Sequence, residues 1–219
     1  MTLLWLASAA EFSPRAIIQL MIKVIYFDYH GVLDRHYYRG MLERIATASG
    51  RPNPAQVAAD LADYGYRYAT GQVSPHEFWL TIATDYGQAA DQAGRKYMLH
   101  VAPVLEMWNL VSTVKNNYET GLFSDCAIDK KEVIRSAYSL TDYFDYLILS
   151  CDVQLSKRDP QIYQLMLQGG KFRPEECLMI DDTVDNTVLA AEQGFATHIF
   201  TDPSTLKSYL NQLPDAQNL

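Results

Sequence analysis

Short apolar runs that stop at a polar residue recur along the chain, and each one predicts a buried strand. The first is KVIYFD, residues 23–28, in which four apolar residues lead to a carboxylate. Continuous apolar runs of this length are typical of strands that are covered on both faces. Four later runs follow the same pattern: residues 118–123, 146–150 with a continuation to 153, 177–180 and 197–200.

The segments between the later strands have the spacing of helices. They cover residues 129–138, 159–168, 184–193 and 204–212. Strands that alternate with helices predict an α/β fold, in which a Rossmann-like parallel sheet is covered by helices on both faces. In such sheets the ligand crevice lies outside the carboxyl ends of the strands. Asp28, Ser124 and Asp181 each stand at such an end, so we expect them to lie close together.

A long segment after the first strand has no strand pattern. Within residues 35–112, apolar residues recur at helical spacing, as in Val57, Leu61, Tyr64 and Tyr68. We therefore predict an α-helical insert over residues 35–112. The Rossmann-like core is then formed by residues 22–34 and 113–219, after an N-terminal extension of residues 1–21.

The composition excludes some classes of function. The 219 residues are 48% hydrophobic and 20% charged, with a net charge of -8. Nucleic-acid binding needs basic surface, so this acidic balance argues against a nucleic-acid partner. Outside the N-terminus no segment approaches the ~20 apolar residues of a membrane span. Three widely separated cysteines without CxxC spacing indicate reduced thiols and a cytoplasmic location.

The N-terminal segment partly resembles a signal peptide. Ala7-Ser8-Ala9 is similar to a cleavage site, yet no Lys or Arg precedes the short apolar stretch. We therefore interpret residues 1–20 as a non-native extension, with the working protein beginning at Met21.

Four motifs stand in order at the predicted element boundaries. They are FDYHGVL around Asp28, GLFSDC around Ser124, SKRDPQIY around Lys157 and MIDDTVDN around Asp181 and Asp182. Together they resemble the motifs of the haloacid dehalogenase superfamily, in its phosphatase-like branch, and they span nearly everything after Met21. The resemblance implies a hydrolase whose helical insert forms a cap domain between the first and second motifs.

The resemblance also implies a nucleophile and a metal site. Asp28 would attack phosphorus and form an aspartyl-phosphate, which splits one difficult step into two. Mg²⁺ is the implied cofactor, because it prefers hard oxygen ligands. The implied ligands are the carboxylates of Asp28 and Asp181 and the backbone carbonyl of His30, with Asp182 holding a metal-bound water.

Other motif residues would bind the phosphate. Lys157 is implied to stabilise the charge of the nucleophile and of the phosphate, and Ser124 to donate its hydroxyl to the substrate. Two positions depart from the common motif: Asp125 stands where Asn is frequent, and Arg158 where proline is common. Taken singly, each site residue also fits a turn former or helix cap, so the joint order of the motifs carries the interpretation.

The residue two positions after the nucleophile leaves three interpretations open. Family phosphatases usually have a second aspartate there, and this chain has His30. His30 can itself be the general acid/base, since imidazole has a pKa of about 6.5. Alternatively, the protein binds metal and phosphate with little or no catalysis. In the third interpretation it is a 2-haloacid dehalogenase, against which the acidic pair Asp181-Asp182 argues. A turn histidine without a chemical role fits nearly as well as the catalytic one.

The combined prediction is a Mg²⁺-dependent phosphatase. A cap of this size closes over a crevice and suits a small phosphorylated metabolite as substrate. We expect no nucleic-acid or membrane partner, and a monomer or a homodimer.

Overall fold

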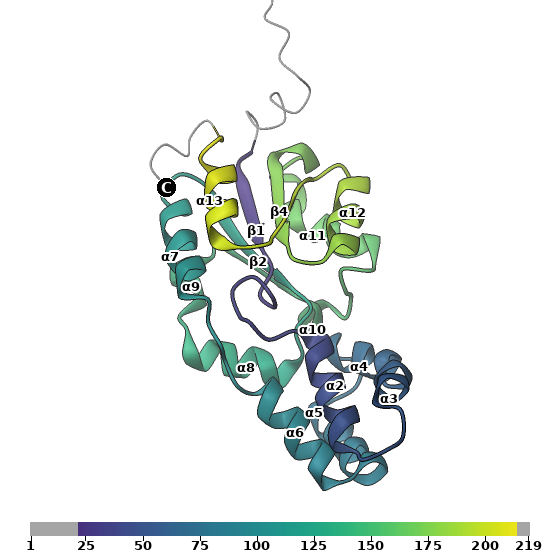
Figure 1. Ribbon diagram of the computed structural model, residues 1–219. Coiled ribbons are helices and arrows are strands. Elements are labelled where there is room, and N and C mark those ends of the chain that lie inside the picture. The colour runs from purple at the N-terminus through teal and green to yellow at the C-terminus, as the bar shows by residue number, and fades with distance from the viewer. Residues whose placement is uncertain (1–21, 214–219) are drawn as a thin grey trace, which may run out of the picture.

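Five parallel strands form the centre of the molecule, in the order β3-β2-β1-β4-β5. They are β1 (Val24–Phe27), β2 (Glu119–Ser124), β3 (Tyr146–Leu149), β4 (Cys177–Asp181) and β5 (Ala196–Ile199). The computed structural model describes residues 22–213, and the predicted N-terminal extension lies outside the described residues. Figure 1 shows the sheet flanked by helices, which confirms the predicted Rossmann-like α/β fold.

Both faces of the sheet are buried, which explains why its strands are continuous apolar runs. In β1, Ile25 and Phe27 point into one hydrophobic cluster, and Val24 and Tyr26 point into another on the opposite face. The first cluster is covered by α7 (Leu105–Val114), α8 (Ile128–Ala137), α9 (Leu140–Tyr143) and α13 (Pro203–Leu210). The second is covered by α11 (Pro160–Met166) and α12 (Val184–Glu192), with the short turns η2 (Gln168–Gly170) and η3 (Pro174–Glu176) nearby.

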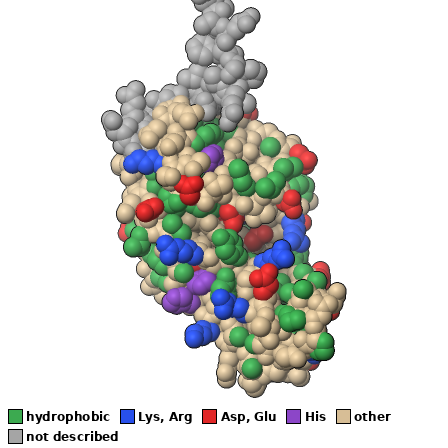
Figure 2. Space-filling model, in the orientation of Figure 1, with side chains coloured by type: hydrophobic (Ala, Val, Ile, Leu, Met, Phe, Trp, Pro, Cys, Tyr) green, Lys and Arg blue, Asp and Glu red, His purple; other side chains and the backbone are tan. Residues whose placement is uncertain are grey.

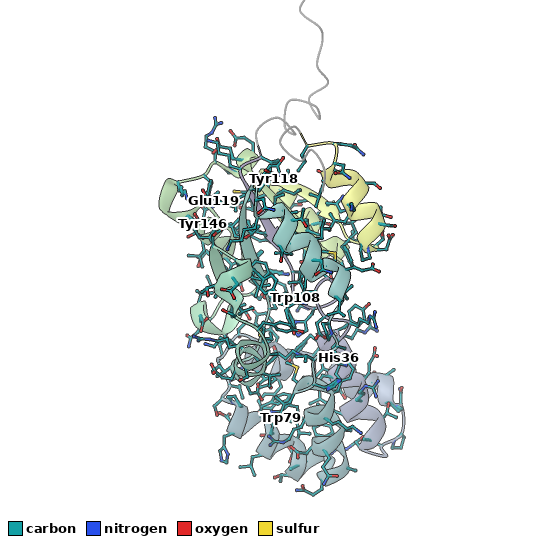
Figure 3. The ribbon with its side chains drawn as sticks, turned by 90° about the vertical axis from the view of Figure 1, so that its left-hand side faces the viewer. His36, Trp79, Trp108, Tyr118, Glu119 and Tyr146 are labelled. Carbon is teal, nitrogen blue, oxygen red and sulfur yellow. The ribbon has the colours of Figure 1, made fainter. Side chains whose placement is uncertain are left out.

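The helical insert has a hydrophobic cluster of its own. Its elements are α2 (Tyr38–Ala48), α3 (Pro54–Asp60), α4 (Ala62–Ala69), α5 (Pro75–Thr81), a π-helical turn η1 (Ile82–Tyr86) and α6 (Gln88–Met98). They lie together below the sheet in Figure 1. Two of these helices have N-terminal caps: the side chains of Asn53 and Ser74 accept hydrogen bonds from the first turns of α3 and α5. In Figure 3 Trp79 lies within this insert, whereas Trp108 lies beside the sheet.

Two predicted boundaries differ from the structure. Residues 105–112 were assigned to the insert, but α7 packs on the sheet because Met107, Trp108 and Val111 face its core. The strand predicted to continue to residue 153 ends at Leu149, and Ser150–Val153 form a short helix, α10. The Ser150 hydroxyl accepts from the Cys126 backbone N–H at 2.8 Å and donates to a carbonyl of the insert at 2.7 Å, which places this turn against two other segments.

The strand register aligns the carboxyl ends of the three central strands. Phe27 of β1 pairs with Leu122 of β2 and with Ile180 of β4. The residues that follow, among them Asp28 and Asp181, therefore emerge at one edge of the sheet. Within residues 22–213, none of the helices combines the length and the apolar character that crossing a bilayer requires.

Candidate active site

Three carboxylates meet at this edge of the sheet. Asp28 follows β1, Asp181 ends β4 and Asp182 comes next, and one ligand oxygen of each lies within 4.8 Å of the others. The backbone N–H of Asp28 donates to the carbonyl of Ile180 at 3.0 Å, so the sheet ladder itself holds the first carboxylate beside the other two. The expected meeting of Asp28 and Asp181 is therefore present.

Lys157 joins two of these carboxylates. Its Nζ lies 2.8 Å from Oδ1 of Asp28 and 2.6 Å from Oδ2 of Asp181. The side chain comes from the loop before α11 and is only 1% exposed. The Tyr163 hydroxyl donates to the Lys157 carbonyl at 2.8 Å, which holds the loop in place from α11. A buried charge without a partner destabilises the fold, so this ion pair fixes the relative positions of the three side chains.

The loop after β4 presents Asp181 through local hydrogen bonds. The backbone N–H of Thr183 donates to Oδ1 of Asp181 at 2.8 Å, and the Asn186 amide lies 3.1 Å from both of its carboxylate oxygens. Asn186 is in the first turn of α12, so the start of that helix and the acidic loop are tied together. These contacts leave Asp181 completely buried and fixed in orientation.

Gly31 makes room for the third carboxylate. Its φ is +77°, and a Cβ built on it would lie 2.2 Å from Oδ2 of Asp182. A side chain at this position would therefore collide with the acidic loop as well as strain the backbone. Sequence reasoning missed this role, although a glycine inside the first motif was a signal for a left-handed turn.

The charge balance of the site favours a cation. Burial raises the pKa of Asp28, the nearby carboxylates of Asp181 and Asp182 raise it further, and Lys157 opposes them. Burial lowers the pKa of Lys157, but Asp181 and Asp28 outweigh it, so the net shift is upward and the ammonium stays charged. One buried lysine faces three acids. Clustered hard oxygen ligands with excess negative charge are the donor set that Mg²⁺ prefers, and the residues present fit it.

Ser124 and Asp125 occupy the end of β2. The Ser124 hydroxyl is buried, and it has no hydrogen-bond partner within residues 22–213. Asp125 accepts a hydrogen bond from the Lys157 backbone N–H at 3.0 Å, so its carboxylate is paired. Burial raises the pKa of Asp125 to about 6. The Ser124 hydroxyl is thus not engaged by another described residue, while Asp125 positions the lysine loop.

His30 differs from its expected protonation state. The side chain is 8% exposed, and its Nε2 contacts no hydrogen-bonding atom in the described part of the chain. Burial lowers the pKa of His30 to about 3, and the positive charges of Lys130 and Lys157 contribute. The reference pKa of about 6.5 that suggested proton transfer near neutrality therefore does not hold in this environment. The imidazole is neutral at pH 7 and can only offer or accept a hydrogen bond.

The carboxylates open into a large cavity beneath the insert. Its volume is about 980 Å³, and both Asp28 and Lys157 line it together with side chains of α2, α3 and α4. On the face shown in Figure 2, acidic and basic side chains gather where the insert meets the sheet. Arg158 also lines the cavity and lies over the Tyr66 ring at 5.7 Å, so the extra cation of the third motif faces the site.

Polar contacts fasten the insert to the core on one side of this cavity. The Tyr66 hydroxyl donates to Oδ2 of Asp159 at 2.9 Å, two residues after Lys157. On α8, Asp129 accepts from the Tyr68 hydroxyl and, at 2.8 Å, from the Trp79 indole N–H. These bonds position the wall of the cavity relative to the carboxylates.

The sequence of this chain matches a family model over most of its described length. The model of haloacid dehalogenase-like hydrolases covers residues 22–194. The chain belongs to this hydrolase family. The fold and the order of the four motifs are thereby accounted for by common descent with other members.

Two curated relatives share part of this sequence. Bifunctional epoxide hydrolase 2 of Rattus norvegicus is 27% identical over 150 residues, which is 68% of this chain and 26% of that protein. The Sus scrofa protein of the same name is 38% identical over 80 residues, 36% of this chain and 14% of that protein. The family member described here therefore spans about a quarter or less of the length of these two relatives.

Solved structures share the fold over nearly their whole length. The family enzyme bt-2542 of Bacteroides thetaiotaomicron, as an aspartate-to-alanine mutant with magnesium and inorganic phosphate, has a TM-score of 0.69 at 20% identity, covering 84% of this chain and 98% of that one. L-2-haloacid dehalogenase of Xanthobacter autotrophicus, with chloropropionic acid covalently bound, has a TM-score of 0.56 at 16% identity, covering 87% and 82%. At these identities the likeness concerns the fold.

Proposed function

We propose that this family member is a magnesium-dependent phosphatase that works through an aspartyl-phosphate on Asp28. The observation that carries the proposal is the meeting of Asp28, Asp181 and Asp182 around Lys157 at the ends of two neighbouring strands. A magnesium ion held by Asp28, Asp181 and the His30 carbonyl, with Asp182 supporting it through a water, would supply positive charge to the phosphoryl oxygens. Phosphoryl transfer needs this kind of neutralisation and alignment more than elaborate covalent chemistry.

The attacking oxygen follows from the hydrogen bonds of Asp28. Oδ1 accepts from Lys157 and, at 2.6 Å, from the Tyr29 backbone N–H, so we assign the attack to Oδ2. A bond forms between Oδ2 and phosphorus while the bond to the leaving oxygen breaks. Water then attacks phosphorus and loses one proton to the solvent, from which the released leaving group takes one up. The bond to Asp28 breaks, and inorganic phosphate leaves with the carboxylate restored. Lys157 and the Ser124 hydroxyl bind phosphoryl oxygens through both steps.

The leaving oxygen determines how fast the first step runs. A neutral, buried His30 is a poor proton donor, and loss of a general acid costs ~10²–10⁴-fold for basic leaving groups. Aryl and acyl phosphates leave as weakly basic anions and need little protonation. We therefore expect this enzyme to prefer phosphates with such leaving groups.

The neutral state of His30 also supports the second candidate, a metal- and phosphate-binding protein with little catalysis. Dehalogenation remains the third, because the acidic pair retained beside Asp28 favours a cation. A small phosphorylated substrate is supported by the phosphate found with bt-2542. We place the protein in the cytoplasm on the basis of its three buried free thiols.

Hydrolysis of 4-nitrophenyl phosphate with and without Mg²⁺ tests the proposal. We expect activity that requires the metal and that Asp28→Asn abolishes. Asp63→Asn, at an exposed position of α4, is the control for removing one carboxylate and should retain wild-type activity. Unchanged turnover in Asp28→Asn would overturn the assignment of the nucleophile. Chloride release from 2-chloropropionate without metal would instead support dehalogenation.

A further inference from the structure

One wall of the cavity is a row of methyl groups on the insert. Ala55, Ala58 and Ala59 of α3 line it together with Ala62, the first residue of α4. The other face of the same segment carries Val57 and Leu61, which are buried in the cluster of the insert. Packing alone therefore does not require the alanine row, since the apolar residues that anchor α3 point away from the cavity.

The row leads away from the carboxylates. Ala62 stands one helical turn before Tyr66, whose hydroxyl is bonded to Asp159 beside the Lys157 loop. From Ala62 the row continues back along α3 to Ala55, which spans about 10 Å at ~1.5 Å per helical residue. The cavity continues along this whole distance, because residues at both ends line it.

The polar groups of the facing wall already have partners within the protein. Leu42 and Tyr38 of α2 line it, and the Tyr38 hydroxyl is already donated to the Gly65 carbonyl. Arg39, Glu43 and Thr47 of α2 also line the cavity. Arg39 and Glu43 pair with each other at 3.0 Å, and the Thr47 hydroxyl donates to the Glu43 carbonyl at 2.8 Å. A sugar hydroxyl placed between such walls would lose its hydrogen bonds to water without replacement, whereas an apolar chain would gain from leaving water.

A separate observation indicates that a ligand enters this cavity. His30 lines it, is more than nine-tenths buried, and has an Nε2 without a partner among the residues described. Buried polar atoms are almost always paired in native proteins. A polar atom of a ligand, next to the carboxylates and at the start of the alanine row, would complete it.

We propose that the substrate is the phosphoric ester or anhydride of an extended apolar group, whose chain lies along Ala62, Ala59, Ala58 and Ala55. This rests on the proposed phosphatase function and specifies its leaving group. The phosphate occupies the site of Asp28 and Lys157, and the oxygen that joins it to the chain lies near His30. Hydrolysis by water releases inorganic phosphate and the apolar phenol or carboxylic acid.

The test is a series of 4-alkylphenyl phosphates with methyl, butyl and octyl chains. A para-alkyl chain leaves the acidity of the phenol nearly constant, so only the apolar length varies. We expect kcat/KM to rise by about two- to fourfold per added methylene while the chain lies against the row, as the transfer of apolar surface predicts. Equal kcat/KM values along the series would overturn the proposal that the chain binds along the alanine row, and would leave the proposed phosphatase function standing.

Ala59→Trp and Ala89→Trp form the matched pair of variants. Ala59 is exposed in the groove, and Ala89 is exposed on α6 of the same insert but does not line the cavity. Ala59→Trp should bring the octyl-to-methyl ratio of kcat/KM close to one, and Ala89→Trp should keep the wild-type ratio. A wild-type ratio in both variants would contradict the placement of the chain. The series on the wild type decides the question even if one variant does not fold.

A binding measurement separates failure of the groove from failure of the chemistry. Octylphosphonate and methylphosphonate cannot be hydrolysed at phosphorus, and calorimetry in the presence of Mg²⁺ compares their affinities. If no aryl phosphate is hydrolysed, the proposed function fails, and at least tenfold tighter binding of octylphosphonate would still support the groove. Equal affinities would overturn it.

Discussion

A Cβ atom on Gly31 would lie 2.2 Å from Oδ2 of Asp182. The turn after the nucleophile and the loop after β4 are thus in direct contact, and a side chain at residue 31 would displace the Asp182 carboxylate. This contact brings the first and the fourth motif, which are far apart in the sequence, to the same cluster of carboxylates.

Gly31→Ala is expected to impair both folding and the site. The positive φ costs about 1–2 kcal/mol for a residue with a Cβ, and the displaced Asp182 should lower Mg²⁺-dependent activity by more than tenfold. Gly50→Ala is the control, because Gly50 has a φ of +66° while its Cβ would meet no described atom within 4 Å. Urea unfolding should show similar backbone costs in both, and activity should fall only in Gly31→Ala. An equal loss of activity in the two variants would refute the contact.

Asp182 is expected to matter for the metal more than for the fold. Asp182→Asn removes one charge next to the ion and should weaken Mg²⁺ binding by about 10–100-fold, as losses around metal ligands usually do. Titration calorimetry measures this directly. Asp185→Asn, three residues on and exposed in the first turn of α12, should bind Mg²⁺ like the wild type. Wild-type affinity in Asp182→Asn would remove this residue from the site.

The effect of His30→Asp on the rate of hydrolysis should depend on the leaving group of the substrate. His30→Asp supplies a carboxyl where the neutral imidazole stands, so hydrolysis of butyl phosphate should increase by about 10²–10⁴-fold. Phenyl phosphate, whose leaving group needs little protonation, should change much less. Steady-state rates with both esters measure the ratio, and His76→Asp, at an exposed site on α5, is the control. If His30→Asp slows butyl phosphate and leaves phenyl phosphate unchanged, the wild-type imidazole is itself the proton donor.

The folded protein should lose stability as the pH falls below 6.5, because His30 is buried. Burial lowers its pKa in the folded protein to about 3 from 6.5. Between these two values the unfolded chain binds a proton that the folded protein does not, so the free energy of unfolding decreases as the pH falls from 6.5 toward 3. Urea unfolding at pH 7, 6, 5 and 4 in EDTA should show a shallower decline in His30→Asn than in the wild type. His76→Asn serves as the control, and an unchanged decline in His30→Asn would show that the buried imidazole does not contribute.

Asp129 is expected to hold the insert against the core. Asp129→Ala leaves the Tyr68 hydroxyl and the Trp79 indole without their acceptor, and each buried unpaired donor costs about 1–3 kcal/mol. The free energy of unfolding should therefore fall by about 2–6 kcal/mol. Asp142→Ala, at an exposed position of α9, should change it by no more than about 0.5 kcal/mol. A small effect at both positions would mean that water replaces Asp129.

Local patterns in the sequence were sufficient for much of the fold. A buried strand of a parallel sheet is apolar on both faces, so residues 23–28 and 177–180 could be recognised without knowing their neighbours. Their carboxyl ends share one edge in any such sheet, and this placed Asp28 beside Asp181 in advance. The helical spacing of the insert was equally local. The end of the insert could not be recognised from local spacing, because α7 is an amphipathic helix that suits either hydrophobic core. Only the packing assigns Met107 and Val111 to the sheet.

The tertiary structure alone decided what depends on contacts between distant segments. Gly31 and Asp182 approach each other only because β1 pairs with β4. The pKa of His30 depends on the burial that the folded chain imposes and on the charges of Lys130 and Lys157, which a residue type cannot reveal. The four alanines likewise do not stand out in the sequence, and only the placement of α2 and α3 around the cavity shows that they line it. Residue types thus determined the chemistry available, and long-range packing determined which atoms meet and in what charge state.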